Sequence, residues 1–293
     1  MVSLSSTTCV DMKLREKSRF LKEATKQSRR RFRQSFRDYL APVDYTRQVE
    51  IPALLEVISR ENSGKMSTLD IASPQVLSCF LASQNSENKI TYLNSFKPEL
   101  DQMRVRRGSG ELDNIDEVLL DARDASCFGA NTFDLVVSCS VLEHVTSMAG
   151  SDGDALICQN VAKWLKPGGL FVLSVPFHTT GFSEYRDKPV YQDQERSKEG
   201  YFFQRFYDSE SFEKRLVESN ELSVERKIYV GEKHYFPNDI YKRFAFLVGV
   251  GWRKLFLGKA LPVLSSIFME VSEKVEHLRK PYLVVVCLKK EVK

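Results

Sequence analysis

Several features that would identify common classes of protein are missing from this chain of 293 residues. Its six cysteines are scattered, with no CxxC pair and no cluster of cysteine and histidine, which argues against a structural zinc site and a disulfide framework. The N-terminus has no basic stretch followed by an apolar one, so no secretory signal is predicted. We therefore expect a cytoplasmic protein with reduced thiols.

The sequence also lacks a hydrophobic run long enough to cross a membrane. The most apolar region, residues 244–269, is interrupted by Arg253, Lys254 and Lys259, whereas a spanning helix needs ~20 apolar residues. What is present is an ordinary globular mixture, with 42% hydrophobic and 28% charged residues, which is enough for a large buried core. Disordered and fibrous chains are excluded.

The positive charge is concentrated near the N-terminus. Residues 11–40 contain eleven lysines and arginines against four acids, an excess of seven, while the whole chain has a net charge of +4. This stretch has no glycine or proline and predicts one or two helices, ending before Pro42. We interpret residues 1–45 as a basic helical arm that either caps the core or contacts phosphate groups.

From residue 68 onward, short apolar strands alternate with helices. Strands are predicted at residues 68–72, 89–93, 118–120, 133–138, 170–175, 222–230 and 282–288. Helices are predicted at residues 74–82, after Pro98, and at 152–165 and 209–219. Apolar strands separated by helices are typical of a parallel sheet covered on both faces, which is an α/β doubly wound fold.

A segment of different composition separates the last two predicted strands. Residues 231–280 are aromatic and basic, and we expect a helical insertion there. Within it, residues 241–268 mix Phe, Leu and Trp252 with lysine and arginine, a mixture suited to a helix lying at a membrane surface. The alternative is that the insertion packs on the sheet or forms a dimer contact, so the oligomeric state is left open.

Two motifs contain the fourth and fifth predicted strands. The sequence FDLVVSCSVLEHV spans residues 133–145, and LKPGGLFVLSVP spans residues 165–176. Together with Asp70 at the end of the first strand and Asp121-Ala122 after the third, they give residues 65–230 a pattern that resembles class I S-adenosylmethionine-dependent methyltransferases of the type 11 group. This resemblance implies a mostly parallel, seven-stranded, Rossmann-like sheet in a domain of residues 46–293.

The resemblance also implies where S-adenosylmethionine binds. Asp70 ends the first strand beside the cofactor, and Asn94 stands where the family usually has an acidic residue for the ribose. The carboxylate of Asp121, next to Ala122, matches the position that accepts a hydrogen bond from the adenine amino group. Ser140 matches the position near the methionine part. Ligands of open α/β sheets bind at these carboxyl ends of the strands.

The first loop, Ala72-Ser73-Pro74, departs from the family pattern because it has no glycine. Glycine is usual there because a backbone without a side chain lets the cofactor come close. Ala72 is small, and Pro74 is suited to open a helix. Two interpretations stay open, namely a divergent loop that still binds the cofactor, with Ala72 and Ser73 lining it, and a decayed site in a scaffold or binding protein.

Four residues are candidates for work on the acceptor. His144 and His178 follow the fourth and fifth strands, and histidine is suited to accept a proton from a hydroxyl at neutral pH. Residues 179–200, after His178, are expected to be irregular and are long enough to line an acceptor pocket. Arg205 and Tyr207 lie in YFFQRFYDSESF, residues 201–212, and are predicted to reach the acceptor. The alternative is that Phe203 and Phe206 anchor the next helix and that Arg205 is an ion-pair partner.

The class of acceptor follows from motifs that are missing. No Asn/Asp-Pro-Pro-aromatic loop follows the fourth strand and no Pro-Cys nucleophile occurs, which argues against a nucleic-acid substrate. A nicotinamide-dependent oxidoreductase would need a Gly-x-Gly-x-x-Gly loop, which is also missing. We expect methyl transfer to a small-molecule, sugar or lipid-linked acceptor, on oxygen, without a metal.

Overall fold

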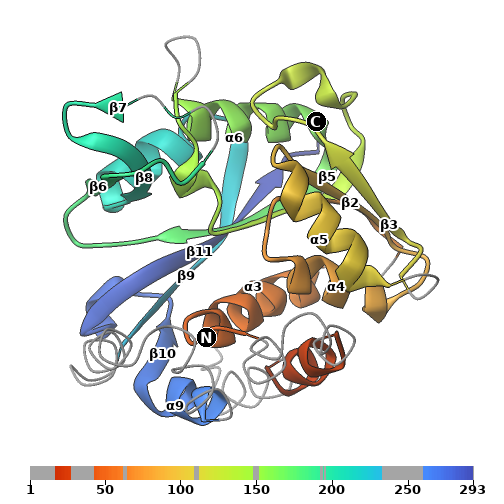
Figure 1. The fold of residues 1–293 in the computed structure, drawn as a ribbon, viewed down its shortest axis with the longest axis horizontal. Coiled ribbons are helices and arrows are strands. Elements are labelled where there is room, and N and C mark those ends of the chain that lie inside the picture. The colour runs from red at the N-terminus through yellow and green to blue at the C-terminus, as the bar shows by residue number, and fades with distance from the viewer. Residues whose placement is uncertain are drawn as a thin grey trace.

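The computed structural model describes residues 17–27, 43–61, 65–108, 112–147, 152–191, 194, 196–232 and 260–292. An eight-stranded sheet forms its centre, in the order β10-β9-β11-β5-β4-β1-β2-β3 (Figure 1). Its strands are β1 (Ser67–Ile71), β2 (Lys89–Asn94), β3 (Ile115–Leu119), β4 (Phe133–Cys139), β5 (Leu165–Pro176), β9 (Leu222–Glu232), β10 (Met269–Ser272) and β11 (Lys280–Lys290).

The direction of the strands confirms the doubly wound α/β fold. Strands β1 to β5 are mutually parallel, and β11 is inserted antiparallel between β5 and β9. The strand order reverses between β1 and β4, the place where ligands of such sheets bind. The sheet has one strand more than the seven expected, because β10 pairs with β9 at the edge.

Helices cover both faces of the sheet because side chains alternate between the faces along each strand. One face is covered by the helix of residues 17–27 with α3 (Arg47–Glu61), α4 (Gln75–Gln84) and α5 (Lys97–Arg107). The other face is covered by α6 (Gly153–Trp164) and α7 (Ser209–Phe212), which continues into a π-helical turn, η3 (Glu213–Val217).

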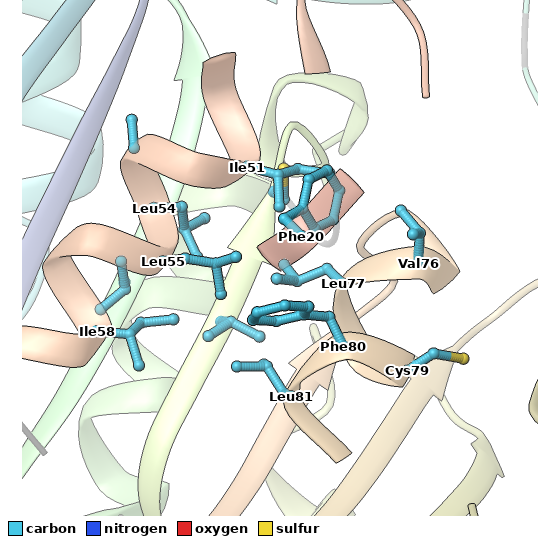
Figure 2. Close-up of a cluster of buried hydrophobic side chains, with 14 of the residues drawn as sticks. Phe20, Ile51, Leu54, Leu55, Ile58, Val76, Leu77, Cys79, Phe80 and Leu81 are labelled. Carbon is cyan, nitrogen blue, oxygen red and sulfur yellow. The ribbon is translucent and has the colours of Figure 1, made fainter. Parts of the chain in front are cut away.

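The first face shows how the N-terminal helix joins the domain. Phe20 is completely buried and its ring meets that of Phe80 of α4 edge-on, at 5.8 Å between centroids. Figure 2 shows Phe20 between Ile51 of α3 and Leu77 of α4. Lys17 of the same helix donates hydrogen bonds to Ser265 and Ser266 of α9 (Leu261–Phe268). The rest of the predicted basic arm lies outside the described residues.

Three local expectations need correction. Residues 179–200 were expected to be irregular, but they contribute to a small antiparallel sheet of order β6-β8-β7. Its strands are β6 (Phe182–Arg186), β7 (Arg196–Ser197) and β8 (Gly200–Phe206). The third strand of the large sheet was expected at 118–120 and begins three residues earlier, at Ile115. The expected helical insertion contains α9 but also β10, while residues 233–259 lie outside the described part.

Short helical turns complete the described chain and none approaches the length of a membrane span. They are η1 (Ala125–Cys127), η2 (Leu142–His144) and η4 (Val275–His277). Among the residues that the structure describes, no helix is long and apolar enough to cross a bilayer, and no group of side chains is arranged to hold a metal ion.

Candidate active site

The first loop has the backbone shape that a glycine would provide. Ala72 adopts φ = 50°, in the left-handed region, and its N–H donates to the carbonyl oxygen of Leu93 at the end of β2. Such a conformation is uncommon for a residue with a Cβ atom. The surroundings therefore hold the loop in this conformation in spite of the missing glycines, with Ala72 and Pro74 partly exposed and Ser73 buried.

Buried side chains hold this loop in place. The carboxyl group of Asp70 accepts hydrogen bonds from the N–H of Ser73, at 2.9 Å, and from the hydroxyl of Ser78. Burial raises the pKa of Asp70 to about 6, against the effect of these hydrogen bonds. The Ser73 hydroxyl accepts a hydrogen bond from the N–H of Cys139, at 3.0 Å, which ties the loop to the end of β4. Asp70 and Ser73 therefore act on the loop through the protein interior, and the backbone of the loop is what a cofactor would meet.

Asn94 and Asp121 lie at the ends of β2 and β3, as predicted, and both have partners within the chain. The Asn94 side chain accepts a hydrogen bond from the N–H of Phe96 at 2.8 Å. The Asp121 carboxylate is paired with the guanidinium of Arg123, at 2.6 Å for the shortest N–O distance. Although partial burial opposes it, the hydrogen bonds from Arg123 lower the pKa of Asp121. The neighbouring Ala122 is buried, and its carbonyl accepts a hydrogen bond from Asn160 of α6.

Ser140 begins the chain that follows β4 and also has a left-handed backbone, with φ = 51°. Its hydroxyl donates to the carboxylate of Glu50 of α3, which also accepts from the hydroxyl of Ser174 at 2.7 Å. Arg47 completes the set with an N–O distance of 2.6 Å to Glu50. Burial would raise the pKa of Glu50, but the guanidinium and the two hydroxyls hold it below its usual value. Arg47 and Glu50 were not predicted as site residues. Their spacing of three residues, which places both side chains on one side of a helix, was the feature that could have indicated the pair.

Glu143 and His144 form η2, directly after Ser140. His144 Nδ1 lies 2.7 Å from the carbonyl oxygen of Phe203 of β8. Since a carbonyl oxygen only accepts hydrogen bonds, Nδ1 carries the proton in the neutral ring and Nε2 has the free electron pair. Burial lowers the pKa of His144, so the ring is neutral at pH 7.

The Glu143 carboxyl group is the second titratable group of this turn. It is 1% exposed, and Oε1 lies 3.8 Å from His144 Nε2. Oε2 has no hydrogen-bond partner in the described part of the chain. Burial raises the pKa of Glu143 to about 8. A buried carboxyl group with an unused oxygen beside a neutral histidine is typical of a site built for proton transfer.

The small sheet covers this turn with aromatic rings. Tyr191 and Phe203 are stacked with nearly parallel planes, and the His144 ring lies 5.4 Å and 5.2 Å from their centroids. The Arg186 guanidinium lies over the ring of Phe203, at 4.3 Å from the ring centroid. Tyr191 is 40% exposed and therefore forms a wall that a ligand would meet.

The remaining predicted residues lie apart from this turn. The His178 ring lies within 3.1 Å of the backbone of Thr180 and edge-on to Phe182, in a local turn after β5. Arg205 and Tyr207 donate hydrogen bonds to Asp154 of α6, at 3.0 Å and 2.7 Å. Tyr207 has no exposed surface. The contact of this pair with the acceptor stays a prediction, and in the structure their shared partner Asp154 joins the end of β8 to α6.

Comparisons with known proteins agree with this geometry. Residues 69–173 match the type 11 family described as a methyltransferase domain. A search of curated protein sequences found no match. Similar solved structures share the fold at low sequence identity. The cyclase SpnF is 14% identical with a TM-score of 0.53, over 84% of this chain and 83% of that one.

Two methyltransferase structures are similar to the same extent. One from Bacillus halodurans C-125 is described as a putative methyltransferase; it is 14% identical with a TM-score of 0.51, over 82% of this chain and 99% of that one. An S-adenosylmethionine-dependent methyltransferase from Clostridium acetobutylicum ATCC 824 is 15% identical with a TM-score of 0.51, over 85% and 93% of the two chains.

Proposed function

Because the chain carries a type 11 S-adenosylmethionine-dependent methyltransferase domain in residues 69–173, we propose that it methylates a hydroxyl group of a small-molecule acceptor at the carboxyl ends of β4 and β5. One observation carries this proposal, namely the free Nε2 of the neutral His144 beside the buried carboxyl group of Glu143. The proposal keeps His144 as the base and leaves His178 outside the reaction.

The described residues fit the cofactor that this family uses. The left-handed backbone of Ala72 keeps the first loop open, and Asp121 presents a carboxylate at the end of β3. The first loop, Asn94, Asp121 and Ser140 are the residues that we propose to hold S-adenosylmethionine. When bound, it supplies an activated methyl group, so the protein must orient the acceptor and accept its proton.

Proton acceptance falls to His144. The acceptor hydroxyl loses its proton as its oxygen becomes nucleophilic, and Nε2 of His144 takes that proton. The hydrogen bond from Nδ1 to the Phe203 carbonyl oxygen fixes the ring during this step. The ionised form of the adjacent Glu143 carboxyl group stabilises the protonated ring, since opposite charges attract strongly where water is largely excluded.

Calorimetric titration with S-adenosylmethionine and S-adenosylhomocysteine is the experiment that tests this proposal. We expect saturable binding of both, followed by transfer of labelled methyl groups to members of a panel of small hydroxyl compounds. Absence of binding at millimolar ligand would contradict the proposal and favour a scaffold protein with a methyltransferase fold.

Contact with a membrane surface remains a separate part of the proposal. Most of residues 241–268 lie outside the described residues, but α9 exposes Val263 and Ile267, one helical turn apart. This pair favours a lipid-linked acceptor reached from a bilayer surface. In liposome flotation, the protein should rise with anionic vesicles at low salt and less at high salt. Recovery in the soluble fraction at low salt would contradict it.

A further inference from the structure

Arg47 of α3 is a cation, and some of its N–H groups make no hydrogen bond to another described residue. Its Nη1 donates to Glu50 at 2.6 Å and lies 3.4 Å from the sulfur of Cys139. Within the described ranges, no group accepts a hydrogen bond from Nε or Nη2. The Arg47 side chain is 26% exposed, against 2% for Glu50. The guanidinium is therefore anchored through Nη1, while Nε and Nη2 of this partly exposed side chain have no acceptor among the described residues.

The position of Arg47 is defined by two elements that border the reversal of strand order. Cys139 is the last residue of β4, and its N–H donates to the side chain of Ser73 in the first loop. Strands β1 and β4 are adjacent in the sheet. Arg47 therefore lies where the first loop and the end of β4 meet, at the edge that binds ligands in this fold.

The partner of Arg47 is buried and does not compete for a ligand. Glu50 accepts hydrogen bonds from Ser140, Ser174 and Arg47. It holds the guanidinium in place, and its side chain is too buried to reach a second cation. A preorganised guanidinium with open N–H groups is suited to bind a planar carboxylate through two parallel hydrogen bonds.

We propose that Arg47 binds the α-carboxylate of the methionine part of the cofactor, and that Glu50 is a positioning residue that fixes both Arg47 and Ser140. This inference rests on the proposed function, because it assumes that S-adenosylmethionine binds at this edge. A carboxylate on the acceptor is the other source of the same chemistry, and the experiment must separate the two.

The test compares two ligands that differ in the amino-acid part. S-adenosylhomocysteine carries the α-carboxylate, whereas 5′-methylthioadenosine has the same nucleoside and sulfur without it. Calorimetry should show that Arg47→Met weakens binding of S-adenosylhomocysteine by about ten- to a hundredfold, the usual effect of losing a hydrogen bond to a charged group. Binding of 5′-methylthioadenosine should stay unchanged.

Control variants distinguish a specific loss of binding from unfolding of the protein. Arg47→Met leaves the buried Glu50 carboxylate without its cation, so the double variant Arg47→Met/Glu50→Gln removes both charges together and should show the same selective loss. Arg104→Met, on the exposed side of α5, removes a cation of equal charge and should change neither affinity.

Each other outcome overturns the inference. An equal loss for both ligands would mean general damage to the site, and no loss for either would assign Arg47 to the acceptor or to structure alone. An unchanged affinity for S-adenosylhomocysteine with a raised KM for the acceptor would identify the acceptor's carboxylate as the partner. If the unmodified protein binds neither ligand, the proposed function fails as well, whereas binding of both with an unchanged preference in the double variant overturns only this inference.

Discussion

Two sides of the site are built in different ways. The cofactor side consists of the ends of β1, β2 and β3 with Ser140 and Arg47, and the transfer side consists of η2 and the small sheet. On the cofactor side, several partners are close in sequence, as in Asp70 with Ser73 and Asp121 with Arg123. On the transfer side, His144 contacts Phe203 of β8, 59 residues away.

We expect this difference because the cofactor side serves a ligand common to the family, whereas the transfer side serves one particular acceptor. The first loop keeps its shape without glycine because the buried carboxyl group of Asp70 and the N–H of Cys139 both hold it. The transfer side joins η2 to β8, so its chemistry depends on how these elements pack. The following variants test whether the two sides are as independent as their contacts indicate.

The largest effect is expected on the transfer side, for His144→Gln. Removing a general base lowers the rate by about 10²–10⁴-fold, so kcat should fall while the affinity for S-adenosylmethionine stays the same. His178→Gln is the matched control and should retain activity. If both variants stay fully active, the acceptor needs no base, as for a carboxylate.

The pH dependence of the unmodified enzyme is a second test of His144 as the base. Burial lowers the pKa of His144 below its usual value of 6.5, so the base is neutral at pH 7. The rate should therefore hold at neutral pH and fall as the pH drops through this lowered value, because the protonated ring cannot accept a proton. A rate that rises with acidity would contradict His144 as the base.

The variant Asp154→Asn tests how α6 stabilises the small sheet. Asp154 has no exposed surface and pairs with Arg205 and Arg215. Removing one member of a buried ion pair leaves charges without compensation and costs about 3–5 kcal/mol. Urea unfolding should show this loss in the free energy of unfolding. Asp152→Asn, at an exposed carboxylate of the same helix start, should cost less than about 1 kcal/mol. An equal loss of stability in the two variants would show that the buried ion pairs of Asp154 are not important for stability.

On the cofactor side, Asp121→Ala should weaken binding of S-adenosylmethionine by about ten- to a hundredfold, equivalent to 1.5–3 kcal/mol for a hydrogen bond to a charged group. Asp116→Ala removes the same charge from an exposed position on β3 and serves as the control. Calorimetry measures both. Equal affinity in all three proteins would show that the Asp121 carboxylate serves Arg123 alone.

The smallest effect concerns the strain of the first loop. Ala72→Gly relieves a left-handed backbone that costs a residue with a Cβ roughly 1–2 kcal/mol. The greater freedom of glycine in the unfolded chain offsets about 0.4–1 kcal/mol of that gain. Thermal unfolding should therefore show a small increase in stability, whereas Ala162→Gly in α6 should lose about 1 kcal/mol. A loss of similar size at both positions would mean that Ala72 is not strained.

Much of the fold was predictable because its signals are local. Apolar strands alternating with helices placed β1, β2, β4 and β5 correctly, and the two motifs that contain β4 and β5 predicted the edge at which we propose the site. Residues 179–200 were misjudged because β6 and β7 are short and largely exposed, and they form a sheet only by pairing with β8. Periodicity within one segment does not reveal such pairing.

By itself, the sequence predicted the methyltransferase domain and the mostly parallel sheet, because hydrophobic periodicity and short motifs depend on neighbouring residues alone. Only the tertiary structure decided that Glu50 and Arg47 join Ser140, that Phe203 orients His144, and that Asp154 takes up Arg205 and Tyr207. These contacts join residues about 50 to 90 positions apart. Their energy is gained only after packing has brought the elements together, so no local pattern records it.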